Sequence, residues 1–226
     1  MEKGKLIVIE GTDCSGKQTQ SDLFVDALKS RGIAVKKYQF PNYASPTGKI
    51  IAGPYLGKEG YCKGYFSEGA TNVDPRVASL YFAADRKYNI KEIQDMLNAG
   101  TNVVVDRYVD SNFAHQGSKI YDDFEREKLF RFLEVLEYDL LQLPKPDITI
   151  FLHMPSEVAK ELQKARKEKP DQHEMDEQFL KNSEKTYLSL CYRHNYIKIS
   201  CVSEQGLKSV DDIHLEILDK ILSELS

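Results

Sequence analysis

The chain has 226 residues, of which 41% are hydrophobic and 29% charged, and its net charge is −4. This size and composition fit one α/β domain with a sizeable core, and the slight negative charge excludes a broad nucleic-acid-binding surface. No stretch reaches the about 18 apolar residues of a membrane-spanning helix, and the four cysteines lack a CxxC spacing, so we expect reduced thiols in a cytoplasmic protein.

Short β-branched runs alternate with helical segments along the chain. This alternation predicts a single α/β domain over residues 1–226, with a parallel five-stranded sheet covered by helices on both faces. In such sheets, ligands bind at the carboxyl ends of the strands. Two segments, 53–72 and 163–176, resist assignment. The predicted strands are 5–10, 35–40, 102–106, 147–154 and 196–202, and the predicted helices are 18–30, 75–99, 124–143, 174–194 and 210–225.

The sequence GTDCSGK at 11–17 lies between the first strand and the first helix. Glycine, four residues, glycine and lysine in this context are typical of a P-loop, whose backbone N–H groups surround phosphate oxygens. Gly11 and Gly16 allow the tight curve, and Lys17 is expected to bridge the β and γ phosphates of ATP. The predicted ATP-binding residues are Gly11, Thr12, Asp13, Cys14, Ser15, Gly16, Lys17, Gln18 and Thr19.

The expected Mg²⁺ site departs from the usual P-loop pattern. The position after the lysine is normally Ser or Thr, whereas here it is Gln18, followed by Thr19. The Gln18 carbonyl could ligate Mg²⁺ or hold one of its waters, or Thr19 could take this role instead. The sequence leaves both possibilities open. Asp106 ends a buried strand beside the loop and is expected to hold Mg²⁺ or its waters.

Two further motifs identify a family. FAADR at 82–86 lies on a predicted helix, and DRYVDSNFAHQG at 106–117 follows a buried strand. Together with EGTD at 10–13 and KQTQ at 17–20, they resemble thymidylate kinases over nearly the whole chain. The resemblance implies a P-loop NTPase-type fold with a short mobile lid. It also implies transfer of the γ-phosphate of ATP to dTMP, giving dTDP and ADP for dTTP synthesis, with Mg²⁺ and in a homodimer.

The resemblance also implies roles for the acceptor site. It places Asp13 near the acceptor phosphate and sugar, stacks Phe82 on thymine and lets Arg86 hydrogen-bond the base. Residues i and i+4 share a helix face, so Phe82 and Arg86 can address one base, although the helix alone would favour a core position for the ring. Arg107 offers a bidentate fork to the acceptor phosphate, or forms a structural ion pair.

Further acceptor-site positions follow from the resemblance, and some depart from the family pattern. Ser111 and Gln116 resemble residues on the thymine edge, while Phe40 and Pro41 resemble the turn that grips the monophosphate. Many members have Tyr where His115 stands, near the sugar. Many also have Arg where Tyr43 stands, so the phosphate grip is expected to rest more on Arg107, with help from Lys49.

The charged segment 163–176 is expected to be the lid. Phosphoryl transfer needs positive charge around the γ-phosphate, and the family supplies an arginine from the P-loop or from the lid. Cys14 follows Asp13 in the loop, so the lid is expected to supply it, and Arg166 is the only arginine of that segment. A solvated surface stretch is the alternative. The predicted catalytic residues are Lys17, Asp13, Arg107 and Arg166.

Two other functions remain open. One is a kinase for another deoxynucleoside monophosphate. The other is a nucleotide-binding module with little catalysis, which the unusual residues Gln18, Tyr43 and Gln172 motivate.

Overall fold

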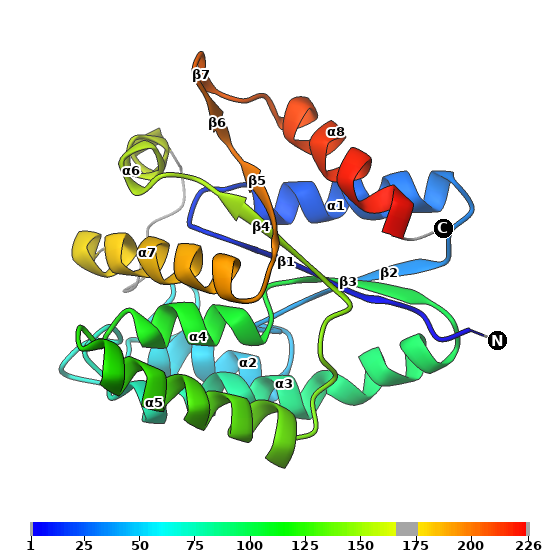
Figure 1. The fold of residues 1–226 in the computed structure, drawn as a ribbon. Helices are drawn as coiled ribbons and strands as arrows, with labels where there is room; N and C mark the ends of the chain where they lie inside the picture. The colour runs from blue at the N-terminus through cyan, green and yellow to red at the C-terminus, as the bar shows by residue number, and fades with distance from the viewer. Residues whose placement is uncertain (1, 166–175, 225–226) are drawn as a thin grey trace.

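The computed structural model describes residues 2–165 and 176–224, and a parallel sheet forms its centre (Figure 1). The strand order is β2-β3-β1-β4-β5 and every neighbouring pair is parallel. The predicted five-stranded parallel sheet flanked by helices is therefore confirmed. The strands are β1 (Leu6–Gly11), β2 (Val35–Gln39), β3 (Asn102–Asp106), β4 (Ile148–His153) and β5 (Ile197–Ser200).

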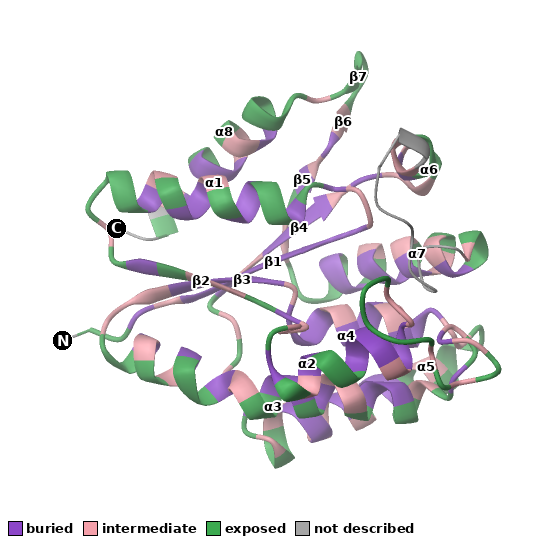
Figure 2. Ribbon diagram, turned by 180° about the vertical axis from the view of Figure 1, so that it is seen from behind, coloured by how far each residue is buried: buried purple, intermediate pink, exposed green. Residues whose placement is uncertain are grey.

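Helices cover both faces of the sheet because successive strand side chains point to opposite sides. Leu6 and Val8 belong to one apolar core, and Ile7 and Ile9 to the other. Both cores are buried between sheet and helices, as Figure 2 shows. On one face lie α1 (Lys17–Ser30) and α8 (Val210–Ile221), and on the other α3 (Pro75–Asn98), α4 (Val109–Gly117), α5 (Asp123–Glu134) and α7 (Glu177–Arg193).

The helices largely begin where the sequence predicts. The Asp74 side chain caps α3 by accepting from the Arg76 and Val77 N–H groups at 2.8 and 3.1 Å, with Pro75 in the first turn. The helix expected over 124–143 is α5 followed by the π-helix η2. Several short elements were not predicted besides α4: α2 (Pro46–Ile50), η1 (Ile51–Tyr55), α6 (Ser156–Ala165), β6 (Val202–Ser203) and β7 (Gly206–Leu207). The short elements η2 (Val135–Leu140) and η3 (Leu222–Glu224) fall within predicted helices.

The unassigned segment 53–72 is a packed loop. It starts within η1 and continues as turns up to α3; we call residues 56–74 the insert loop. Tyr55, Leu56, Ala70 and Val73 are buried together with Ala78 of α3 in a third apolar cluster. The insert loop is thus anchored against α3 rather than extended into solvent.

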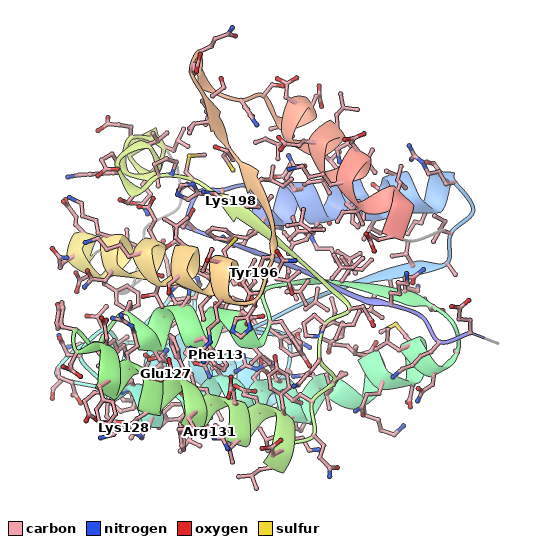
Figure 3. All side chains as sticks on the ribbon, in the orientation of Figure 1. Phe113, Glu127, Lys128, Arg131, Tyr196 and Lys198 are labelled. Carbon is pink, nitrogen blue, oxygen red and sulfur yellow. The ribbon has the colours of Figure 1, made fainter. Side chains whose placement is uncertain are left out.

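An ion pair joins two of the helices on the α3 side of the sheet. Glu127 of α5, labelled in Figure 3, accepts two hydrogen bonds of 2.6 Å from the Arg193 guanidinium of α7.

Within residues 2–165 and 176–224, no helix is both long and apolar enough to cross a membrane. Arg166 and most of the predicted lid lie outside the described residues.

Candidate active site

The turn between β1 and α1 has the geometry of an anion-binding loop. A Cβ at Gly11 would lie 2.5 Å from the Ser15 Oγ and 2.7 Å from the Leu152 carbonyl oxygen, so only glycine fits there. Gly16 adopts a φ of +75°, which glycine tolerates without strain. Among the residues that the structure describes, no side chain caps the N-terminus of α1, so its first N–H groups are available to a phosphate.

Lys17 folds back over this loop. Its Nζ donates to the carbonyl oxygens of Gly11 and Thr12 at 3.0 and 2.8 Å. Burial, with Arg107 nearby, lowers the pKa of Lys17 to about 8. An anionic phosphate beside the ammonium group favours its charged form. The lysine is therefore suited to hold the terminal phosphates of a nucleotide.

A cavity of about 250 Å³ adjoins the loop. It lies where β1, β2 and β3, adjacent in the sheet, reach their carboxyl ends, which is where parallel sheets bind ligands. The cavity brings together both predicted metal residues and the predicted acceptor-site residues except Lys49. Its lining includes Asp13, Gln18, Phe40, Pro41, Phe82, Arg86, Asp106, Arg107, Ser111, His115 and Gln116.

A charged group lies at the tips of β1 and β3. Arg107 donates to the Asp13 carboxylate at 3.1 Å, and its other terminal nitrogen lies 3.3 Å from the His115 Nε2. Burial opposes ionisation of Asp13, but Arg107, Lys17 and His115 together lower its pKa to about 2. Arg107 has a φ of +62°, a strained conformation for a side chain of this size. The strand tip thus presents a fixed cation beside the P-loop.

A second group of lining residues carries unsatisfied polar atoms. Arg86 is buried and ion-paired with the fully buried Glu137, to which its Nε donates at 3.0 Å. The Asn112 amide donates to the same carboxylate at 3.1 Å. Among the described residues, the Asn112 Oδ1 and both amide atoms of Gln116 have no hydrogen-bond partner. Because buried polar groups are normally hydrogen-bonded, these atoms call for a polar ligand in the cavity.

The residues near Asp106 fit a magnesium ion. Asp106 is 8% exposed and lines the cavity together with Gln18, whereas Thr19 does not line it. Within the described part of the chain, no group of three or more His, Cys, Asp or Glu side chains is placed to hold a metal. One carboxylate and one amide oxygen suit Mg²⁺, which keeps several waters and is completed by substrate phosphates. The geometry favours Gln18 over Thr19.

Comparison with known proteins agrees with this geometry. The thymidylate kinase family model matches residues 9–213. The chain belongs to the thymidylate kinase family. It is 33% identical to the probable thymidylate kinase of Methanocaldococcus jannaschii over 96% of both chains, and 29% identical to the thymidylate kinase of Schizosaccharomyces pombe over 97% of this chain and 92% of that one.

A solved thymidylate kinase structure is also similar. The Candida albicans enzyme, whose structure is described as revealing the origin of its broad substrate specificity, superposes with a TM-score of 0.73. The two share 26% identity, and the match covers 98% of this chain and 92% of that one. This thymidylate kinase family member therefore has the fold of its relatives as well as their motifs.

The sequence missed several residues around the cavity. Asp85 and Asn112 line it and lie inside the two family motifs, so the motifs themselves were the signal. Leu56 and Lys58 line it from the insert loop, and Glu137 acts from η2; no motif marks them. Lys49, expected to help grip phosphate, is exposed and is not part of the lining.

One predicted thymine contact is partly engaged within the protein. The Ser111 hydroxyl donates to the buried Glu10 carboxylate at 2.6 Å. Glu10 also accepts from the Tyr108 N–H at 2.8 Å and the Tyr187 hydroxyl at 3.0 Å, which ties β1 to the start of α4 and to α7. The Ser111 oxygen can therefore only accept from a ligand, and its contact with thymine stays a prediction.

Proposed function

We infer that this enzyme transfers the γ-phosphate of ATP to dTMP, giving dTDP and ADP on the route to dTTP. The observation that carries the inference is a single cavity with the cation Arg107 and the P-loop residue Asp13 in one part of its wall. Another part holds the buried amides of Asn112 and Gln116, which keep polar atoms without a partner among the described residues. Such a wall suits a ligand with a phosphate at one end and a polar base at the other.

The donors and acceptors of the base end match thymine. Arg86 can only donate, and two of its five N–H groups remain after its bonds to Glu137 and to the Tyr108 carbonyl oxygen. Thymine presents carbonyl oxygens on either side of an N–H group, so Arg86 meets an oxygen while an amide oxygen of Gln116 or Asn112 accepts the N–H. Cytosine has an amino group in place of one of these carbonyl oxygens. That group would meet Arg86 as one hydrogen-bond donor against another.

The transfer is in line and needs no general base, because the acceptor is already an anionic phosphate. Lys17 and the loop N–H groups hold the donor phosphates, while Arg107 orients the acceptor phosphate. Asp106 and Gln18 are the residues that would hold Mg²⁺, which when bound neutralises phosphate charge. Arg166 is proposed as the lid cation. Asp13 positions the acceptor sugar and Arg107, and His115 lies beside that arginine.

A coupled ADP-release assay tests the function. We expect turnover with ATP, Mg²⁺ and dTMP, and a much lower kcat/KM with dCMP or dGMP; dUMP and thymidine complete the panel. Lys17→Ala is expected to reduce kcat by about 10²-fold or more, since one preorganised charge contact with the transferring group is lost. Lys29→Ala, an exposed residue of the same helix, is the control.

Three results would contradict the proposal or its mechanism. If dGMP or dCMP were the preferred acceptor, the enzyme would be a kinase for another deoxynucleotide. If no acceptor released ADP while ATP still bound, the chain would be a nucleotide-binding module. A Lys17→Ala variant that melts like the wild type and keeps its rate would remove the loop from the mechanism.

We also propose that the enzyme is a cytoplasmic homodimer. All four cysteines are free thiols, which suits a reducing compartment.

On α3, Val77, Leu80 and Tyr88 are 42%, 50% and 61% exposed, and their spacing puts them along one side of the helix. An apolar stripe of this kind suits packing against a second copy.

A further inference from the structure

The first residues of the insert loop hold Lys58 at a fixed place beside the cavity. The N–H of Lys58 donates to the Ala52 carbonyl oxygen in η1 at 2.8 Å. Leu56, two residues earlier, is buried and itself lines the cavity. The backbone of Lys58 is therefore anchored to the third apolar cluster, so its side chain starts from a defined position in the wall.

The side chain of Lys58 contacts an aromatic ring of the loop that follows β2. Its Nζ lies 5.2 Å from the centre of the Tyr43 ring, a cation–π contact, and both residues line the cavity. The Tyr43 backbone follows the Phe40–Pro41 turn, and its N–H donates to the Pro41 carbonyl oxygen at 3.1 Å. The ammonium group is thereby held on the side of the cavity formed by the end of β2.

The charges of the lining explain why a cation is useful there. Three carboxylates, those of Asp13, Asp85 and Asp106, and three cations, Arg86, Arg107 and Lys58, line the cavity. Arg86 is paired with the buried Glu137, and Arg107 with Asp13. A phosphate monoester entering the cavity adds close to two negative charges, so it needs a cation besides Arg107.

We propose that Lys58 is a further acceptor-binding residue, whose ammonium group contacts the phosphate of dTMP. The proposal rests on the proposed function, because it assigns a residue to the acceptor site of that reaction. It gives the insert loop a role, since the loop adds a cation to those that α3 and the end of β3 supply, Arg86 and Arg107.

Calorimetric titration with dTMP and with thymidine tests this assignment, because the two ligands differ only in the phosphate. For Lys58→Met, we expect the Kd of dTMP to rise by about 10- to 100-fold, as for the loss of one charged hydrogen bond. The Kd of thymidine should stay as in the wild type. Lys58→Arg should restore most of the dTMP affinity. Lys63→Met, an exposed lysine of the same loop outside the lining, is the matched control.

The possible results separate this assignment from the proposed function. If the wild type bound neither ligand, the acceptor itself would be wrong. If the wild type bound dTMP and Lys58→Met bound it equally well, Lys58 would not contact the phosphate. An equal loss of dTMP and thymidine affinity would also overturn the proposal, because it would place the effect on the nucleoside or on the fold of the loop.

Discussion

Glu137 of η2 is a fully buried carboxylate that fixes the orientation of Arg86. It also accepts from Asn112, so one side chain orients two residues of the cavity wall. Glu137→Gln leaves the Arg86 charge buried without a countercharge, and we expect a loss of about 2–4 kcal/mol in the free energy of unfolding. Because the arginine is then poorly oriented, the KM for dTMP should rise while the KM for ATP stays unchanged.

Urea denaturation and steady-state kinetics measure the two effects separately. Asp139→Asn, an exposed carboxylate two residues further along, is the control and should leave both unchanged. Wild-type stability together with a wild-type KM in Glu137→Gln would show that Arg86 needs no partner. The sequence does not predict the Arg86–Glu137 pair, because a Glu in an amphipathic segment is ordinarily exposed. Only tertiary packing brings Glu137 to Arg86.

At the scale of elements, Asp85 joins α3 to the loop that follows β2. This buried carboxylate accepts from the Asn42 N–H at 2.8 Å and from the Ser45 and Thr47 hydroxyls at 2.9 and 2.7 Å. Asp85→Ala leaves these donors unsatisfied, and we expect a loss of about 2–4 kcal/mol in unfolding free energy. Since Pro41 and Tyr43 belong to this loop, the KM for dTMP should rise as well.

The same helix offers a control for Asp85. Asp95 is 61% exposed and forms an ion pair with Lys91, itself 82% exposed. Because exposed ion pairs contribute little, Asp95→Ala should change the unfolding free energy by no more than about 0.5 kcal/mol. Equal denaturation midpoints for Asp85→Ala and Asp95→Ala would mean that the loop after β2 does not depend on the hydrogen bonds to Asp85.

The elements also show what the sequence can predict and what it cannot. The five strands and the long helices carry β-branched runs or amphipathic stripes, and these patterns placed them within a few residues. By contrast, α4 buries polar side chains such as Asp110 and Asn112, which hide its apolar periodicity. The P-loop and the two family motifs predicted most of the cavity wall because each motif is contiguous. Lys58 comes from a segment without a motif, so only the fold brings it there.

At the scale of the whole molecule, the apolar stripe on α3 predicts a dimer. We expect the wild type to sediment with twice the mass of one chain, with Val77, Leu80 and Tyr88 in the interface. Leu80→Glu places a charge in that interface, and the dimer dissociation constant should rise by about tenfold or more because the charge is buried without a partner. Tyr192→Glu changes a residue that is 93% exposed on α7 and should leave the dimer intact.

Sedimentation velocity at several protein concentrations distinguishes the outcomes. Because α3 carries Phe82 and Arg86 as well as the stripe, a dimer through this helix would stiffen the element that holds the base. Leu80→Glu should then raise the KM for dTMP in parallel with dissociation, and high protein concentration should restore it. A wild type that stays monomeric at micromolar concentrations, with full activity, would show that the stripe has another use and that α3 positions the base unaided.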